Sequence, residues 1–287
     1  MIPAAVEYTR PSTVDDAVAA LADEDAKVLA GGQSLIPLLR LRLSAPSVLV
    51  DLGGIGELRG IRDDGEALVI GAMTTHATVL RDELVARYAP LLAQATATVA
   101  DRQVRHLGTL GGSLAHGDPA GDLPAVSLAL DATLEVTGAS GTRSVPATEF
   151  FVDYLTTALQ PGEVLTAVRV PKREGWASHY EKFNRVAQAW ALVGVAAMVR
   201  RDNGSIAEAR VALANMAPTP VRAAAVESAL TGAAADVGAV IAAAAQAAEG
   251  TEPSDDLSAS AGYRRHLATV LTERAVLACL NGPAHAA

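Results

Sequence analysis

The sequence of 287 residues contains little cysteine, and this scarcity limits the chemistry that the chain can carry. Its one cysteine, Cys279, excludes an intrachain disulfide, a cysteine-rich zinc site and an iron–sulfur cluster bound by this chain alone. Any iron–sulfur chemistry associated with the protein must therefore be carried by another chain. The sequence also predicts no metal site, because no pair of histidines has metal-ligand spacing together with cysteine or acidic partners.

Aromatic side chains and positive charge are also scarce. Three Phe, five Tyr and two Trp are too few for a platform on which nucleobases stack. The formal net charge of −9 disfavours binding to the phosphate backbone of nucleic acids or to anionic membranes. We therefore expect no nucleic-acid partner.

Long hydrophobic runs are absent as well. The longest apolar stretches, near residues 186–199 and 237–245, fall short of the roughly 20 residues that span a bilayer. The first residues contain neither the basic region nor the apolar region of a signal peptide. These features predict a cytoplasmic protein without an integral membrane segment.

The chain does have a composition that is half hydrophobic and a length that suits about two domains. Ser12 and Thr13 each precede an aspartate by three residues, the capping-box spacing that predicts a helix start. Hydrophobic patterns predict strands and helices in alternation up to residue 170. The predicted strands are 27–30, 48–52, 68–70, 132–136 and 164–170, and the predicted helical stretches begin near 12, 34 and 75.

A polar turn at residues 171–175 is the best candidate for a domain boundary. After it, the pattern predicts three strands and then three alanine-rich helices. The strands are expected at 179–185, 191–200 and 206–215, and the helices at 220–230, 234–248 and 263–280. The coarse prediction is an α+β fold with domains at residues 1–172 and 176–282.

Two segments pair glycines and follow them with a serine. The first runs from Ala30 through Gly31, Gly32 and Gln33 to Ser34 and Leu35; the second runs from Gly108 and Thr109 through Gly111 and Gly112 to Ser113. Glycine lets a backbone turn sharply and approach a ligand closely, and a following helix start adds free amides and partial positive charge. Two such loops are suited to the two phosphates of a dinucleotide.

The common nucleotide motifs are missing. There is no Gly-x-x-x-x-Gly-Lys-Ser/Thr sequence, and Arg59 stands where a Rossmann motif that starts at Gly54 would need its third glycine. Each glycine pair alone fits a tight turn between strand and helix equally well. The recurrence of the pair within one domain favours a ligand.

In order and spacing, both loops resemble the medium, FAD-binding subunit of the molybdenum hydroxylases, the family of carbon monoxide, xanthine and nicotine dehydrogenases. The resemblance also covers Gly121–Pro124, the opening at Tyr8–Pro11, and the segments Tyr180–Arg185 and Trp190–Ala197, and it extends from about Pro3 to Leu280. It implies a two-part FAD-binding domain of two α+β subdomains, followed by a small C-terminal α+β domain with a three-stranded sheet.

The resemblance also implies where FAD is held. The pyrophosphate is expected between the two glycine loops, with His116, Asp122, Leu165, Lys182 and Trp190 near the ribityl, adenine or flavin portions. The residues expected to bind the cofactor are Lys27, Val28, Leu29, Ala30, Gly31, Gly32, Gln33, Ser34, Leu35, Gly108, Thr109, Gly111, Gly112, Ser113, His116, Asp122, Leu165, Lys182 and Trp190. Gln33 departs from the His that carbon monoxide dehydrogenases tend to carry, which favours an organic substrate for the complex.

Several of these residues have a structural alternative. Asp122 also fits a helix cap, His116 a solvated loop residue, Lys182 an ordinary surface lysine and Trp190 a core residue. No catalytic acid–base pair is expected in this chain.

The function implied by the resemblance is electron transfer. Electrons would come from 2Fe–2S clusters of a small partner subunit and pass through FAD on this chain to an external acceptor. Substrate would be oxidised at a molybdopterin centre on a large partner subunit, in a dimer of heterotrimers. A stand-alone flavin oxidoreductase and a non-redox nucleotide-binding module are the alternatives.

Overall fold

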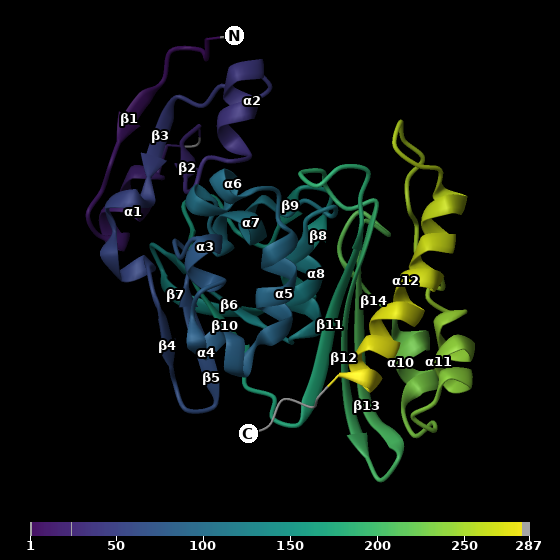
Figure 1. Ribbon diagram of the computed structural model, residues 1–287. Coiled ribbons are helices and arrows are strands. Elements are labelled where there is room, and N and C mark those ends of the chain that lie inside the picture. The colour runs from purple at the N-terminus through teal and green to yellow at the C-terminus, as the bar shows by residue number, and fades with distance from the viewer. Residues whose placement is uncertain (1, 24, 283–287) are drawn as a thin grey trace.

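A computed structural model of the chain describes residues 2–23 and 25–282. The N-terminal lobe contains a parallel sheet of three strands in the order β1-β3-β2 (Figure 1). Its strands are β1 (Glu7–Thr9), β2 (Lys27–Leu29) and β3 (Val48–Asp51), and its helices are α1 (Val14–Ala20) and α2 (Leu35–Leu41). The Thr13 side chain accepts a hydrogen bond from the Asp16 amide and so caps α1, as one of the two predicted capping boxes requires. The Asp16 carboxylate accepts from the Thr13 hydroxyl, whereas a full capping box would have it accept from the Thr13 amide.

The second part of the chain is built on an antiparallel sheet of five strands in the order β4-β5-β10-β6-β7. The strands are β4 (Ile61–Asp63), β5 (Ala67–Gly71), β6 (Thr133–Gly138), β7 (Gly141–Pro146) and β10 (Val164–Pro171). Two short 3₁₀ helices, η1 (Leu52–Gly54) and η2 (Gly56–Leu58), connect the lobe to this sheet.

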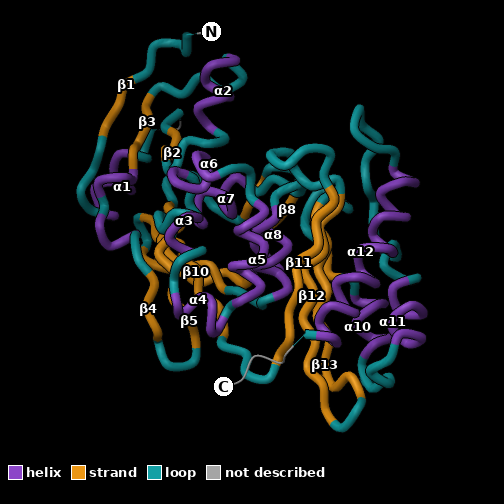
Figure 2. The backbone as a smooth tube through the Cα atoms, viewed as in Figure 1, coloured by secondary structure: helices purple, strands orange, loops and turns teal. Residues whose placement is uncertain are grey.

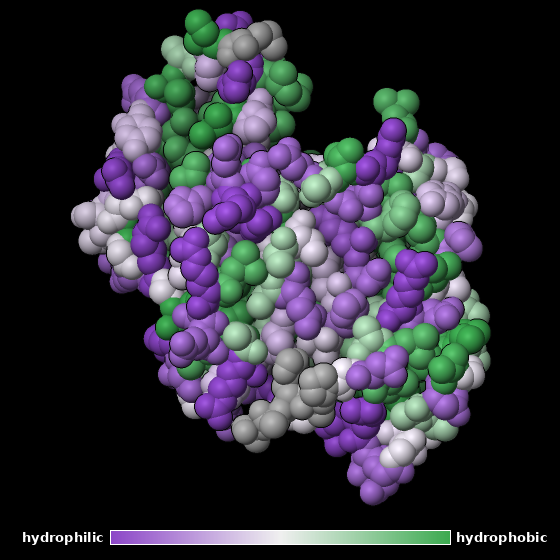
Figure 3. All heavy atoms as spheres, viewed as in Figure 1, coloured by the Kyte–Doolittle hydropathy of each residue, from purple (hydrophilic) through white to green (hydrophobic). Residues whose placement is uncertain are grey.

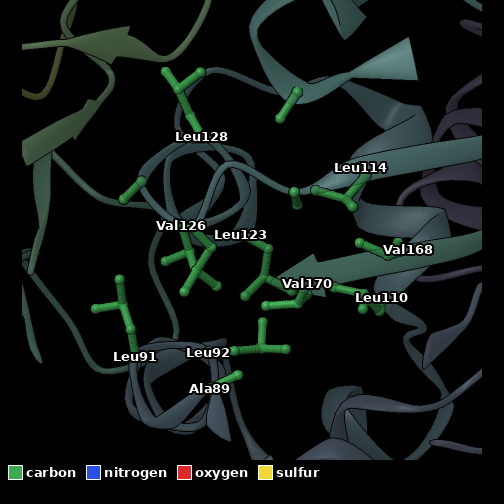
Figure 4. Close-up of a cluster of buried hydrophobic side chains, with 14 of the residues drawn as sticks. Ala89, Leu91, Leu92, Leu110, Leu114, Leu123, Val126, Leu128, Val168 and Val170 are labelled. Atoms are coloured by element: carbon green, nitrogen blue, oxygen red, sulfur yellow. The ribbon is translucent and has the colours of Figure 1, made fainter. Parts of the chain in front are cut away.

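Helices cover one face of that sheet (Figure 2). They are α3 (His76–Val79), α4 (Glu83–Tyr88), α5 (Pro90–Thr98), α6 (Arg102–Leu107), α7 (Leu110–His116), α8 (Asp122–Ala129) and α9 (Ala147–Phe150). Leucines of α5, α7 and α8 meet Val168 and Val170 of β10 in the core (Figure 4). A small hairpin of β8 (Phe151–Asp153) and β9 (Thr156–Thr157) lies beside this layer.

The C-terminal part contains one antiparallel sheet in the order β11-β12-β13-β14. The strands are β11 (Trp176–Phe183), β12 (Val193–Asp202), β13 (Ser205–Ala214) and β14 (Val221–Arg222). The expected three-stranded sheet therefore has a fourth, two-residue edge strand. It falls where a helix was predicted to begin, and α10 starts later, at Ala224.

This sheet is buried on both faces, which joins the two halves of the molecule. Tyr180, Ala196 and Met198 face the core of α5 and α8, whereas Val195, Ala197 and Val199 face the C-terminal helices. Those helices are α10 (Ala224–Leu230), α11 (Val237–Ala244) and α12 (Ala261–Asn281). The predicted boundary between residues 172 and 176 stays a prediction; it falls in the turn between β10 and β11.

Candidate functional site

The two glycine loops lie directly against each other. A Cβ atom added at Gly31 would lie 2.2 Å from the carbonyl oxygen of Leu107 and 2.7 Å from the Cα of Gly108. A Cβ atom at Gly112 would lie 3.3 Å from the Cβ of Ala30. Only glycine permits so close an approach of two backbones, so the glycine pattern of each loop makes room for the other loop.

The first loop presents a run of unpaired backbone amides. Within the described part of the chain, the amides of Gly32, Gln33, Ser34 and Leu35 have no hydrogen-bond acceptor, and the Ser34 hydroxyl makes no capping bond to α2. Gly32 has a φ of +73°, a left-handed conformation that suits glycine. The side chain of Gln33 folds back and donates to the carbonyl of Gly31 at 3.0 Å. These adjacent donors, next to the start of α2, are arranged to bind an anion.

The second loop uses its amides within the protein. Leu110 and Gly111 donate to the carbonyls of Thr74 and Ala72 at 3.0 and 2.9 Å. Gly112 donates to the Thr109 hydroxyl at 3.1 Å, and Ser113 donates to the Thr109 carbonyl at 3.1 Å. This differs from the expectation that both loops offer free amides. The reason is that the carbonyls beyond the end of β5 need donors, and this loop supplies them.

The three residues expected to bind the cofactor before the first loop lie in the strand that leads into it. Lys27, Val28 and Leu29 form β2, an edge strand, with Lys27 exposed and the other two half-buried. The Leu29 side chain lies 3.5 Å from a Cβ built at Gly32, so it packs under the turn.

Asp122 and Lys182, predicted separately from distant segments, meet in a buried ion pair. Lys182 Nζ donates to Asp122 Oδ2 at 2.8 Å and to the Thr98 carbonyl at 3.2 Å, and the two charged side chains are only 5% and 3% exposed. Lys182 is therefore neither a surface lysine nor a free group, and it joins β11 to the first turn of α8.

Tyr180, for which the sequence suggested no role, completes this buried network. Its hydroxyl donates to Asp122 Oδ1 at 2.6 Å. Burial raises the pKa of the Asp122 carboxyl, although the charge of Lys182 and both hydrogen bonds oppose the rise. Burial and the nearby Asp122 charge raise the pKa of the Tyr180 hydroxyl well above its ordinary value. The alternation that places residues 180 and 182 on one face of a strand is the signal that could have identified it.

The remaining predicted residues make no hydrogen bond to this ion pair. His116 is half-buried in the last turn of α7, and Leu165 is 5% exposed at an irregularity of β10. Trp190 is 54% exposed, so it is not a core residue; it lies in the loop between β11 and β12.

One cavity on the surface is lined by none of the residues expected to bind the cofactor. It has a volume of about 540 Å³ and lies on the face of the five-stranded sheet that α1 approaches. Its lining includes Thr13, Glu57, Arg59 and Glu135. A second cavity of about 520 Å³, lined by residues that include Arg210 and Arg222, also contains none of them. The glycine loops belong instead to the open upper side of the molecule, where Figure 3 shows a notch between the N-terminal lobe and the C-terminal part.

Two family models together match nearly the whole chain. Residues 4–173 match the FAD binding domain in molybdopterin dehydrogenase, and residues 178–279 match the CO dehydrogenase flavoprotein C-terminal domain.

Curated relatives match over nearly their full length. The carbon monoxide dehydrogenase medium chain of Hydrogenophaga pseudoflava is 42% identical over 281 residues, which cover 96% of this chain and 97% of the relative. The nicotine 6-hydroxylase medium subunit of Paenarthrobacter nicotinovorans is 36% identical, with 95% and 96% covered.

Solved structures have the same fold. Carbon monoxide dehydrogenase from Hydrogenophaga pseudoflava, in a form lacking the Mo-pyranopterin moiety of its molybdenum cofactor, matches with a TM-score of 0.96 and 43% identity over 100% of both chains. Quinoline 2-oxidoreductase from Pseudomonas putida 86 matches with a TM-score of 0.95 and 37% identity, covering 98% of this chain and 99% of that chain.

Proposed function

Because this chain belongs to the family of FAD-binding medium subunits of the molybdenum hydroxylases, we propose that it is the electron-transfer flavoprotein of such an oxidoreductase complex. It receives electrons from 2Fe–2S clusters of a small partner subunit and delivers them to an external acceptor. A large partner subunit with the molybdopterin cofactor oxidises the substrate, and the complex is a dimer of heterotrimers in the cytoplasm. Among residues 2–23 and 25–282, none of the helices combines the length and the low charge that a membrane span requires.

The observation that supports this proposal most directly is the run of four unpaired amides in the first glycine loop. A diphosphate is an anion that needs several donors at close range, and the amides of Gly32 to Leu35 supply them without a side chain in the way. The partial positive charge at the start of α2 adds to the attraction. The residues therefore fit the diphosphate bridge of FAD.

In this proposal the second glycine loop supports the first loop and does not offer free amides to the diphosphate. Its amides are occupied, so it contributes the Ser113 hydroxyl and a backbone surface on which the first loop rests. Gly112 keeps the space beside Ala30 open. The buried pair of Asp122 and Lys182 holds the C-terminal sheet against the FAD domain. The loop between β11 and β12, which contains Trp190 in the sequence, lies on the upper side of the molecule in Figure 1, as the first glycine loop between β2 and α2 does.

When bound, FAD supplies a group that accepts and releases electrons singly or in pairs. The free amides of the first glycine loop would hold its diphosphate. Cys279 cannot serve as a cluster ligand, because it is the one cysteine, is 1% exposed, and has a thiol pKa that burial raises to about 12. In this proposal the iron–sulfur clusters are therefore bound by a partner chain, and this chain binds the flavin.

The test is to purify the chain together with its partner chains and to measure flavin by its visible absorption. We expect bound FAD, molybdenum and iron in one complex. A flavin-loaded chain that oxidises its own substrate without partners would overturn the subunit assignment, and a colourless chain that binds nucleotides would show a non-redox module.

Two loop variants test the cofactor placement. Gly32→Val and Gly112→Val should each reduce the FAD content to less than about a tenth. Valine at position 32 strains a left-handed backbone, and valine at position 112 pushes against Ala30 and so displaces the first loop. Gly56→Val is the matched control, because no atom lies within 4 Å of a Cβ at Gly56. Full flavin content in both loop variants would contradict the placement.

A further inference from the structure

The loop between β11 and β12, residues 184–192, reaches from the C-terminal sheet to the FAD domain. Gln188 Nε2 donates to Asp101 Oδ2 at 2.7 Å, and Asp101 is the N-cap of α6, the helix that leads into the second glycine loop. Trp190 extends from this loop with 54% of its surface exposed. A half-exposed tryptophan has little packing of its own to hold it, so its position depends on how the loop is anchored.

The C-terminal end of this loop is held by Asn215, the residue that directly follows β13. Its side-chain Nδ2 donates to the carbonyls of Ala191 at 2.7 Å and Leu192 at 3.3 Å. Its backbone amide donates to the carbonyl of Pro119 at 2.7 Å, in the turn between α7 and α8. One residue thus links the Trp190 loop to the segment that directly follows the second glycine loop.

The backbone of Asn215 explains why this residue type stands there. Its φ is +63°, in the left-handed region that asparagine tolerates better than most residues with a side chain. Glycine would also fit this conformation but has no side chain to donate to the loop. Asparagine is therefore suited to form the turn and to hold the loop.

We propose that Asn215 is a positioning residue that holds the 184–192 loop, and with it Trp190, at the mouth of the cofactor site; this rests on the function proposed above. The contacts at Asp101 and Pro119 flank the second glycine loop in the sequence, one before α6 and one after α7. A movement of the segment between Asp101 and Pro119 therefore reaches Trp190 by two routes. One route is the bond from Gln188 to Asp101, and the other is the bond from Asn215 to Pro119.

Arg264 limits how far the loop can be released. Its buried guanidinium also donates to the Leu192 carbonyl, at 2.5 Å, and is held in turn by Asp256. Loss of the Asn215 side chain therefore frees the Ala191 carbonyl and the end of the loop that carries Trp190, while Gln188 stays bound to Asp101 and the start of β12 stays in place. The expected effect is local mobility without unfolding.

The test compares Asn215→Gly with Asn203→Gly. Both positions have a left-handed backbone, with φ values of +63° and +48°, but Asn203 lies exposed in the turn between β12 and β13, at the opposite end of the strands. Hydrogen exchange of the Ala189 amide, which donates to the Val186 carbonyl inside the loop, is measured on the cofactor-free chain. It should become about tenfold faster in Asn215→Gly, because the two side-chain hydrogen bonds that hold the end of the loop are lost. Asn203→Gly should leave it unchanged.

A second measurement follows Trp190 in the FAD-loaded chain. The chain has two tryptophans, and Trp176 is 5% exposed, so Trp176→Phe leaves Trp190 as the reporter. Bound flavin should quench Trp190 fluorescence, and Asn215→Gly and Asn215→Asp should restore at least half of it while the flavin content stays above about four fifths. Asn215→Asp keeps the shape and removes the donors.

The outcomes separate the two proposals. If the parent protein binds no flavin, the proposed function fails, whatever the loop does. If flavin is retained and quenching and loop exchange are the same in Asn215→Gly and Asn203→Gly, the positioning role is wrong. A loss of flavin in Asn215→Gly with unchanged loop exchange would also overturn it.

Discussion

The two glycine loops have nearly the same residues, a glycine pair followed closely by serine, but opposite hydrogen-bonding states. In the first loop the amides of Gly32 to Leu35 have no acceptor in the described chain, whereas in the second loop Leu110 to Ser113 all donate within the protein. The first loop follows an edge strand of a small sheet; the second is packed against the end of β5 and against α3. A glycine pair thus indicates that other atoms come close to the backbone. The tertiary structure decides whether those atoms belong to a ligand or to another part of the protein.

The comparison predicts that changes at the second loop affect folding and changes at the first affect ligand binding. The largest effect is expected from acid, through His76. Its ring is 4% exposed and packs against Gly108, and burial, with a smaller effect of the Arg105 charge, lowers its pKa to about 4. Because the unfolded chain binds the proton at higher pH, stability is fully present above about pH 6.5 and is lost as the pH falls towards 4, by about 3 kcal/mol.

Urea unfolding at pH values from 7.5 to 4 measures this loss. His76→Leu should remove this part of the pH dependence, and His106→Gln, on the exposed side of α6, should keep the dependence of the parent protein. Identical curves for the parent protein and His76→Leu would show that His76 is not the group responsible.

The next effect is expected at Gly111. A Cβ atom there would lie 2.4 Å from the Cβ of Ala72 and 2.7 Å from its Cα and carbonyl oxygen. Gly111→Ala should lower the free energy of unfolding by about 2 kcal/mol, because these backbone atoms cannot move aside. Denaturant unfolding with Gly56→Ala as the control measures it, and equal stability of the two variants would mean that the second loop is not tightly packed.

A smaller effect is expected at Thr109, the N-cap of α7. Its hydroxyl accepts from the Gly112 amide, so Thr109→Ala should lower the free energy of unfolding by about 1 kcal/mol. Thr109→Ser keeps the oxygen and should recover most of the loss. If alanine and serine behave alike in thermal unfolding, the cap does not stabilise the helix.

The smallest effect on stability is expected at Ser34. Its hydroxyl makes no capping bond, so Ser34→Ala should change the free energy of unfolding by less than about 0.5 kcal/mol. FAD affinity should still fall about tenfold, since a hydrogen bond to a charged phosphate is lost. Calorimetric titration with FAD measures this, with the exposed Ser254→Ala as the control; unchanged affinity would separate Ser34 from the diphosphate.

Elements with a clear local pattern were predicted well. Thr13 begins α1 as its spacing to Asp16 indicated, and β10 and α12 lie within a few residues of their predicted ranges. The strand β7 was not predicted, because four of its six residues, Gly141 to Ser144, are glycine or polar and exposed. The helix α8 has no apolar period, since all eight of its residues are buried.

Within the candidate site, the sequence identified several important residues but did not predict their contacts. Asp122 and Lys182 were each expected to contact the cofactor, and the structure pairs them with each other across 60 positions. Tyr180 and Asn215 were missed as functional residues, because the hydrogen-bond partner of Tyr180 lies 58 residues away and the side-chain partners of Asn215 lie 23 and 24 residues away. No local pattern records such contacts.

The amino-acid sequence alone determined which chemistry the chain cannot carry: with one cysteine it cannot bind an iron–sulfur cluster by itself, and its two glycine-rich turns favoured a ligand. These properties depend on residue types and on short-range geometry, which the chain cannot change by folding. Only the tertiary structure decided which glycine loop keeps its amides free and which charges neutralise each other. Hydrogen bonding and burial depend on what lies within a few ångströms in space, and in this protein those neighbours come from distant parts of the chain.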